Sequence, residues 1–283
     1  MATGLSLHVG LNRVDPAEYG GWDGQLVACD NDAHDMARLA RGAGFGTTTL
    51  LTSDGTVENV TAELRRAAKT LKSGDILLFT YSGHGGQVPR ADGADAEPDA
   101  FDETLVFYDR EFLDDELHRE FGRFARGVRI LALLDCCHSG TGIEVREFLT
   151  PEAMQEQFQT RDPRRIENTA RLMPVVKQHE IYQRDKDFFQ ELQRDLAAHK
   201  SRQPAAGALL ISACQDNQLA SDGDVNGKFT GTLLDVWNDG AFRGGYRAFH
   251  RDILRNMPPT QSPHFFVSGQ PDEAFLEQQP FTV

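Results

Sequence analysis

Residues 128–140 have the sequence VRILALLDCCHSG. A short, continuous aliphatic run of this kind is typical of a strand that is buried on both faces of a sheet. It ends in Asp135, two adjacent cysteines, a histidine and a glycine, which are residue types with chemical reactivity. Cys136 and Cys137 are therefore compatible with three roles: small core residues, half of a metal site, or a nucleophile placed by the end of a strand.

Strand and helix patterns alternate on both sides of this run. Strands are predicted at 5–12, 47–52, 75–83, 103–109, 128–135, 207–214 and 264–269, and helices at 30–44, 56–74, 114–124, 229–238 and 246–256. The helices combine apolar residues at helical spacing with N-cap residues and terminal glycines. Continuous apolar strands between such helices predict an α/β fold with a mostly parallel central sheet and helices on both faces.

The composition favours a soluble protein with a sizeable core. The chain has 283 residues, 40% of them hydrophobic, and a formal charge of -14. Nucleic acid and anionic membranes bind basic faces, so we expect neither as a partner. The N-terminal residues do not resemble a signal peptide, and no apolar segment reaches the roughly 18 residues of a membrane span. Four cysteines do not form a disulfide framework in a chain of this size, so we expect a cytoplasmic protein. We also expect a monomer.

A second predicted strand ends in YSGHGG, residues 81–86. In open α/β sheets, ligands bind beyond the carboxyl ends of the parallel strands. A histidine from a neighbouring strand end can take a proton from a cysteine nucleophile and return it, and His84 has this position relative to Cys137. The glycine after His84 leaves a backbone N–H free to face an oxyanion.

Together, YSGHGG and DCCHSG resemble the two catalytic motifs of the caspase-like (caspase–hemoglobinase) fold of clan CD cysteine peptidases, and the chain is most similar to metacaspases and the prokaryotic orthocaspases. LVACDNDAHDM (26–36) resembles the Cys-x-x-Asp segment of that family. ISACQDNQLASDG (211–223) and GKFTGTLL (227–234) resemble its small-subunit segment. The resemblance implies a single domain, in which 1–144 is like the large subunit, 145–206 is a basic helical or mobile surface insertion, and 207–283 is like the small subunit.

The resemblance also implies a cysteine endopeptidase with a Cys–His dyad. Cys137 matches the nucleophile and His84 the catalytic histidine, and the backbone N–H groups of Cys137 and Gly85 match the oxyanion hole. Cys136 would point the other way along the strand and pack in the core. No cofactor is required for this chemistry.

The preferred substrate follows from charge as well as from the resemblance. Asp135 and Cys137 lie two residues apart, so both face the same side of an extended strand. A carboxylate there would raise the pKa of the thiol, unless it binds a cationic substrate side chain. The acidic S1 pocket of metacaspases matches Cys29, Asp32, Ser82 and Asp135, although a favourable charge at a helix N-terminus also explains Asp32. These residues predict protein or peptide substrates cut after Arg or Lys, with Arg favoured where its fork makes two bonds.

A run of carboxylates spans residues 92–116. Carboxylate oxygens are the ligands that calcium prefers, and many metacaspases are activated by calcium. The matching positions are Asp99, Asp114, Asp115 and Glu144, where Glu144 replaces an expected aspartate. The run is equally compatible with a solvated acidic face, so calcium as an activator and a plain acidic surface both remain open.

The basic segment 145–202 contains candidate self-processing sites at Arg161, Arg164, Arg165, Lys200 and Arg202. Ordinary surface helices explain the same composition.

Three alternatives to a general peptidase remain. The first is a zinc site made by the adjacent cysteines with His84 and His138, although its spacing is unusual. The second is a catalytically silent caspase-like scaffold. The third is a protease dedicated to activating one partner protein.

Overall fold

The computed structural model describes residues 2–91, 101–137, 169–199, 205–215, 218–271 and 273–283. The strands are β1 (Gly4–Gly10), β2 (Gly46–Leu51), β3 (Ile76–Ser82), β4 (Gly85–Pro89), β5 (Phe101–Val106), β6 (Glu111–Leu113), β7 (Arg129–Asp135), β8 (Gly207–Ser212) and β9 (His264–Gly269). The α-helices are α1 (Cys29–Gly42), α2 (Val57–Thr70), α3 (Asp114–Phe121), α7 (Val175–His199), α8 (Lys228–Trp237), α9 (Tyr246–Asn256) and α10 (Glu273–Glu277).

Six strands form the main sheet in the order β2-β1-β3-β7-β8-β9. All neighbouring pairs are parallel except β8 with β9, which is antiparallel. The predicted mostly parallel sheet is therefore confirmed. The strands β3 and β7 lie in its centre, where β7 contains the aliphatic run that suggested a buried strand.

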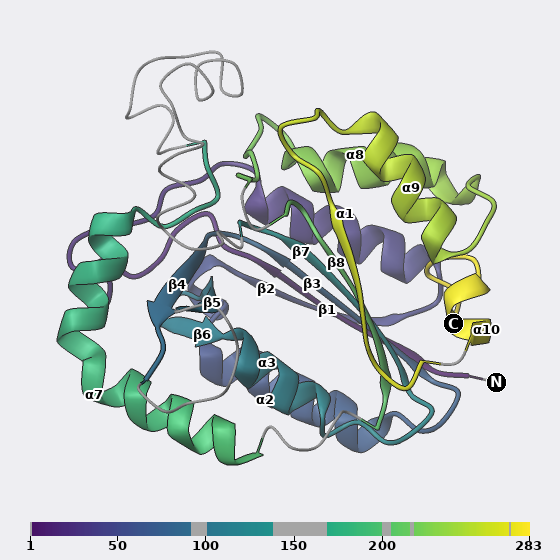
Figure 1. The fold of residues 1–283 in the computed structure, drawn as a ribbon. Coiled ribbons are helices and arrows are strands. Elements are labelled where there is room, and N and C mark those ends of the chain that lie inside the picture. Colours follow the sequence, from purple (N-terminus) through teal and green to yellow (C-terminus); the bar gives the residue numbers. More distant parts are fainter. Residues whose placement is uncertain (1, 92–100, 138–168, 200–204, 216–217, 272) are drawn as a thin grey trace.

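Helices cover both faces of this sheet, as predicted (Figure 1). On one face α1, α8 and α9 bury residues such as Met36, Phe229 and Ile253 against the strands. On the other face α2 and α3 bury Val60 and Phe121, among others. The strands β3, β7 and β8 therefore contribute alternate side chains to two separate apolar cores.

The local signals of α2 illustrate why these helices form where they do. Thr56 precedes the helix in an extended conformation, and its Oγ1 accepts a hydrogen bond from the Asn59 N–H at 3.2 Å. This cap satisfies one of the free N–H groups of the first turn. Val57, Val60 and Leu64 then recur at helical spacing and are buried. The helix is therefore positioned by a cap and an apolar face that the sequence already contains.

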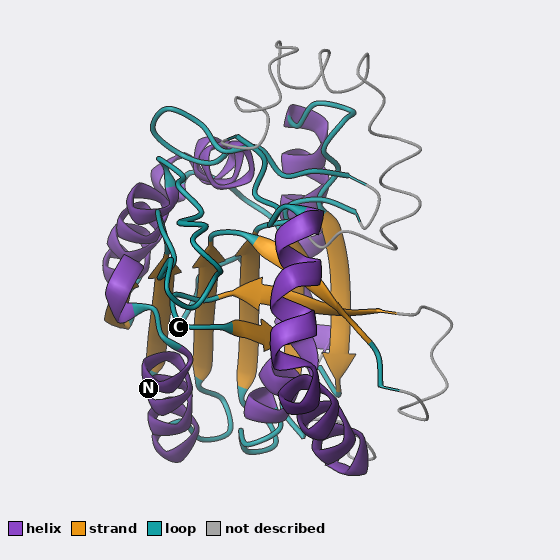
Figure 2. Ribbon diagram, turned by 90° about the vertical axis from the view of Figure 1, so that its left-hand side faces the viewer, coloured by secondary structure: helices purple, strands orange, loops and turns teal. Residues whose placement is uncertain are grey.

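A second, antiparallel sheet has the order β4-β5-β6. Of its strands only the predicted segment 103–109 was expected, and it forms the hairpin arm β5. The other two were not predicted because β4 contains two glycines and a proline, and β6 has only three residues. The helix α7 packs on β4, and Figure 2 shows this long helix crossing in front of the strands.

The segment predicted as a surface insertion, 145–202, differs from expectation in one part. Residues 175–199 form the helix α7, but Ala170 and Leu172 make isolated β-bridges to Ser221 and Gly85. Ala170, Arg171 and Met173 are buried. The description of this stretch as surface was therefore wrong, because single bridges leave no periodic pattern in the sequence.

Candidate active site

The carboxyl ends of β3 and β7 meet at one edge of the main sheet. Ser82 and Asp135 are paired in the parallel register of these two strands. His84 lies two residues after Ser82, and Cys137 lies two residues after Asp135. All four side chains are buried. The structure thus brings together the two motifs that the sequence placed at strand ends.

The backbones of Gly85 and Cys137 approach each other closely. A Cβ at Gly85 would overlap the carbonyl oxygen of Cys137, so a larger residue does not fit there without a backbone shift. The N–H groups of Gly85 and Cys137 donate to the same acceptor, the carbonyl oxygen of Arg171, at 3.0 and 3.1 Å. Two converging backbone donors can stabilise the negative oxygen of a tetrahedral intermediate.

Cys137 is fully buried beside a loop that follows β8. Its Sγ accepts a hydrogen bond from the Ala220 N–H at 3.0 Å and lies 3.7 Å from the Ala220 carbonyl oxygen. In the described parts of the chain, no hydrogen bond joins Sγ to His84. Cys136 belongs to the core on the opposite face of the sheet, as expected for a packing residue. The two sulfurs therefore face different cores, which argues against their binding one zinc ion.

His84 is held from one side of its ring. Its Nε2 lies 3.0 Å from the Gly24 carbonyl oxygen, which can only accept, so Nε2 carries the proton. Trp22 packs on the ring with the centroids 4.9 Å apart. The opposite nitrogen, Nδ1, is buried and has no hydrogen-bond partner among the described residues. Burial lowers the pKa of His84 to about 4, so at neutral pH Nδ1 is an unprotonated base.

An acidic pocket lies next to this pair, and the side chain of Arg171 fills it. Arg171 is fully buried. Its Nη2 donates to Asp32 Oδ2 at 2.7 Å and to Asp222 Oδ1 at 2.9 Å. Its Nη1 donates to Ser82 Oγ at 2.7 Å and to the Asp135 carbonyl oxygen at 3.0 Å. Nη1 also lies 3.0 Å from Asp135 Oδ1, as an ion pair without the alignment of a hydrogen bond.

The carboxylates of the pocket are held by groups other than Arg171. Asp32 accepts from Ser82 Oγ at 2.6 Å and from the Gly227 N–H at 3.0 Å. Asp135 Oδ2 accepts from the N–H and hydroxyl of Thr230 at 2.9 and 2.7 Å. Asp222 Oδ2 accepts from the Val27 N–H at 2.7 Å. These donors hold the carboxylate oxygens in addition to Arg171, so the pocket is well suited to a positive charge.

The pKa shifts in the pocket have clear physical causes. Burial raises the pKa of Asp135 to about 6, although the positive charge of Arg171 opposes this. Burial would lower the pKa of Arg171, but the negative charges around it, Asp135 first, outweigh burial and raise it. Burial also raises the pKa of the Cys29 thiol, which stays neutral, while Arg171 and a hydrogen bond with Ser82 lower it. The predicted pocket residues are therefore all found around one guanidinium.

Two charged residues of the pocket, Asp222 and Arg171, were not predicted. Asp222 supplies a third carboxylate. It lies in the segment ISACQDNQLASDG (211–223), which was part of the family resemblance, but Asp222 was given no role there. Arg171 lies in the segment that was taken for surface. A lone arginine in a basic stretch carries no signal of burial, because its burial depends on three carboxylates from distant parts of the chain.

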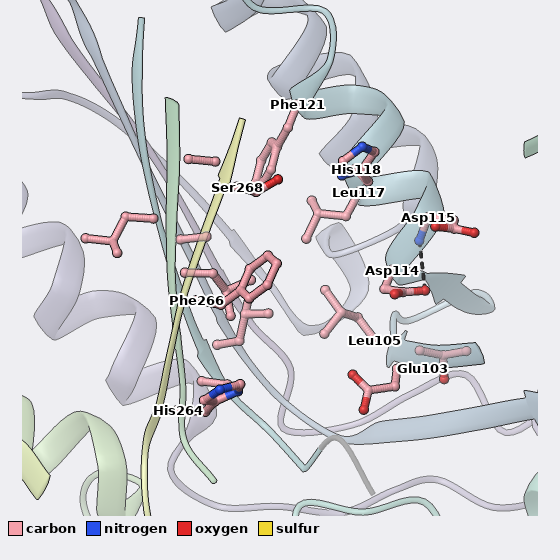
Figure 3. A pocket seen from close by; sticks show the side chains of 17 residues that line it. Glu103, Leu105, Asp114, Asp115, Leu117, His118, Phe121, His264, Phe266 and Ser268 are labelled. Atoms are coloured by element: carbon pink, nitrogen blue, oxygen red, sulfur yellow. Dashed lines mark hydrogen bonds between the residues drawn. The ribbon is translucent and has the colours of Figure 1, made fainter. Parts of the chain in front are cut away.

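Part of the predicted calcium site lies in the described structure. Asp114 and Asp115 begin α3 and line a cavity of about 460 Å³ between α3 and the edge strand β9. In Figure 3, Glu103 and Asp114 lie on one wall of this cavity and His264 and Phe266 on the other. Asp99 and Glu144 lie outside the described residues, as do the five predicted processing sites.

Asp114 is open to solvent on one side but lies against the cavity wall. Desolvation raises the pKa of its carboxyl to about 8, and the charges of Asp115, Glu103 and Asp102 raise it further. Asp102 is itself engaged by Arg90 at 2.7 Å. Within the described ranges, no group of three or more His, Cys, Asp or Glu side chains is arranged to hold a metal ion. The described carboxylates therefore do not form a metal site by themselves.

No helix in the described parts of the chain combines the length and apolar character needed to cross a membrane.

Comparison with known structures supports the fold. A crystal structure of protein GSU0716 from Geobacter sulfurreducens shares 44% sequence identity, with a TM-score of 0.84 over 99% of both chains. Caspase-1 from Spodoptera frugiperda matches with a TM-score of 0.56 at 11% identity, over 95% of this chain and 86% of the other. At that identity the second similarity shows the fold alone.

Sequence comparison shows the family. Metacaspase-1 of Mycosarcoma maydis is 27% identical over 82% of this chain and 62% of its own length. Metacaspase-1A of Aspergillus fumigatus is 30% identical over 81% of this chain and 58% of its own. The chain thus spans about three fifths of the length of these relatives. The model of the caspase domain of the C14 peptidases matches residues 14–275, so this chain belongs to the caspase-domain family of peptidases.

Proposed function

We propose that this protein is a cysteine endopeptidase that cuts peptide bonds after arginine. One observation carries the proposal: a peptide carbonyl lies between two N–H donors beside the Cys137 thiol, while its own arginine side chain fills the acidic pocket. A substrate with arginine before the scissile bond would make the same contacts. The family supports a cysteine peptidase acting on proteins, and the pocket supports the preference for arginine.

In the proposed reaction, Sγ of Cys137 attacks the carbonyl carbon and its proton passes to Nδ1 of His84. The carbonyl oxygen becomes an oxyanion, which the N–H groups of Gly85 and Cys137 stabilise. His84 returns the proton to the leaving amine as the C–N bond breaks, which leaves a thioester. Water then attacks the thioester, forms the carboxylate product and releases the thiol.

Arginine suits this pocket better than lysine. Nη2 binds Asp32 and Asp222, and Nη1 binds Ser82 and the end of β7. These acceptors are divided between two nitrogens of a planar fork, which a single ammonium group cannot reproduce. An aspartate side chain would meet three carboxylates, so cleavage after Asp is not expected.

We also propose calcium as an activator, held by Asp114 and Asp115 with Asp99 and Glu144. Oxygen donors suit Ca²⁺, and the raised pKa of Asp114 reflects desolvation and repulsion that a bound cation would relieve. Titration calorimetry with CaCl₂, on wild type and Asp115→Asn, tests this binding independently of activity.

The experiment that tests the main proposal compares fluorogenic peptides ending in Arg, Lys or Asp, with calcium or EGTA. Wild type is expected to prefer Arg over Lys and to leave Asp peptides uncut. Cys137→Ala is expected to lose hydrolysis, and Cys136→Ala, its neighbour on the other face, to retain it. A preference for Asp would refute the pocket assignment, and activity in Cys137→Ala would refute the nucleophile.

A further inference from the structure

The structure points to Arg171–Leu172 as the bond that this enzyme cuts in its own chain, and we propose that residues 169–173 keep the uncut enzyme latent. The inference rests on the proposed function, since the segment must occupy a working substrate site. It differs from the five processing sites expected from sequence, none of which is Arg171.

The first observation is the placement of the scissile carbonyl. The carbonyl oxygen of Arg171 accepts from both Gly85 N and Cys137 N. Only one peptide carbonyl can occupy this position at a time. While Arg171 is bound there, the carbonyl of another substrate is excluded.

The second observation is that the chain follows the site on both sides of that bond. On the N-terminal side, the Arg171 N–H donates to the Ala220 carbonyl at 3.0 Å, and the Asp222 N–H donates to the Thr169 carbonyl at 2.7 Å. On the C-terminal side, the Met173 N–H donates to the Gly85 carbonyl at 2.9 Å. Main-chain pairing on both sides of a reacting carbonyl is how an extended substrate adds to exposed strand edges.

The third observation concerns the leaving group. The amine released by cleavage would be the nitrogen of Leu172, which follows the carbonyl that the Gly85 and Cys137 N–H groups hold. Among the described residues, the Leu172 N–H donates no hydrogen bond, whereas those of Arg171 and Met173 do. The Arg171–Leu172 bond is therefore held at the two oxyanion donors, one of which is the backbone of Cys137 itself.

Cleavage at this bond follows the proposed chemistry. Sγ of Cys137 forms a bond to the Arg171 carbonyl carbon, the bond to the Leu172 nitrogen breaks, and His84 delivers the thiol proton to that nitrogen. Water then hydrolyses the thioester. The products are a carboxylate at Arg171 and a new amino terminus at Leu172, after which Arg171 is tethered from one side only and can exchange with other substrates.

Two substitutions separate cutting from occlusion. Leu172→Pro keeps Arg171 in its pocket but places a proline after the scissile carbonyl, which should block the cut and leave the enzyme latent. Within the described ranges the substitution removes no hydrogen bond, and Arg171 is already paired as an extended residue, which a following proline favours. Arg171→Gln removes the guanidinium and should leave the chain uncut but open to small peptides. Lys177→Gln, at a half-buried position in the first turn of α7, is the matched control.

The test is intact-mass spectrometry and N-terminal sequencing of purified full-length protein during incubation, with an Arg-peptide assay in parallel. We expect a fragment beginning LMPVV, and peptide hydrolysis that rises at least tenfold as this fragment appears. Cys137→Ala and Leu172→Pro should stay intact and inactive, and Lys177→Gln should behave as wild type. Circular dichroism shows whether each variant is folded.

The outcomes distinguish this inference from the proposed function. If the wild type hydrolyses Arg peptides but its chain stays intact, is cut at another residue, or is equally active before the cut, the inference fails and the function stands. If Leu172→Pro is as active as cut wild type, the occlusion is refuted. If Arg171→Gln misfolds, the peptide TARLMPVV tests the bond in trans, and its survival with active enzyme would refute the site. If no form hydrolyses any Arg peptide, the proposed function itself fails.

Discussion

Gly227→Ala provides a sharp test of the arginine pocket. Gly227 precedes α8, and its N–H donates to Asp32. A Cβ at this position would lie 2.5 Å from Cζ, Nη1 and Nη2 of the bound guanidinium. Its φ of -56° is ordinary for alanine, so the backbone accepts the substitution. The added methyl group therefore acts on the pocket and leaves the surrounding fold intact.

The expected magnitude follows from overpacking. Forcing one methyl group into a filled, buried site costs about 1–3 kcal/mol, which corresponds to roughly a 5- to 150-fold loss in kcat/KM for Arg peptides. Lys peptides should lose less, because an ammonium lacks the planar group that passes over Gly227. The ratio of Arg to Lys hydrolysis should therefore fall.

The assay measures kcat/KM for matched Arg and Lys peptides after identical preincubation. The ratio within each variant is independent of the fraction of active enzyme. Gly231→Ala, one turn along α8, is the control: its Cβ would meet only the Asn226 Cβ at 3.5 Å. Alanine inside a helix is favoured over glycine by roughly 0.5–1 kcal/mol, so this control should be active and slightly more stable. An unchanged Arg-to-Lys ratio in Gly227→Ala would mean that substrates do not bind as Arg171 does.

Three further perturbations test other parts of the site. The pKa of Asp135 is about 6 while a guanidinium is bound. Because the positive charge of Arg171 lowers this pKa, it must be higher when the pocket is empty. The negative charge of Asp135 is therefore present above its pKa and lost as the pH falls through it. KM for Arg peptides should therefore rise as the pH is lowered toward 6, and Asp135→Asn should abolish this pH dependence of KM. A rise in KM on acidification that persists in Asp135→Asn would contradict the assignment. Gly85→Ala, whose Cβ would overlap the Cys137 carbonyl, should lower kcat about 100- to 1,000-fold in a burst-calibrated assay, and normal turnover would exclude Gly85 as an oxyanion donor. Asp222→Asn keeps one acceptor but loses a charge, and should raise KM for Arg peptides about tenfold with little change in kcat; equal KM values would remove Asp222 from the pocket.

The sequence predicted most of the fold because its strands and helices follow simple periodicities. The β7 run, the β3 run and the capped helix α2 each carry local signals that the structure reproduces. The small sheet was largely missed, since β4 is rich in glycine and β6 is very short. Residues that pair singly, such as Ala170 and Leu172, leave no pattern at all.

The residues of the candidate site likewise fall into those that local sequence signals predicted and those whose positions depend on distant parts of the chain. His84 and Cys137 were predicted because each lies just beyond a strand end, in a motif that resembles the family's, so their proximity follows from the order of the strands in the sheet. Asp222 lies in a loop after β8, and its distance from Arg171 depends on how that loop folds over the sheet edge. Arg171 is buried for a reason that no local window contains. Loops and buried ion pairs therefore limit prediction here more than strands do.

The strand ends also explain why specificity and chemistry occur together in this site. On β3, Ser82 faces the pocket and His84 follows it two residues later, and on β7, Asp135 and Cys137 have the same spacing. Side chains two residues apart on an extended chain share a face. A one-residue slip of β7 would turn both Asp135 and Cys137 to the opposite core and bring Cys136 forward. The register between these two central strands, Ser82 opposite Asp135, thus positions the arginine pocket and the reactive thiol as one unit.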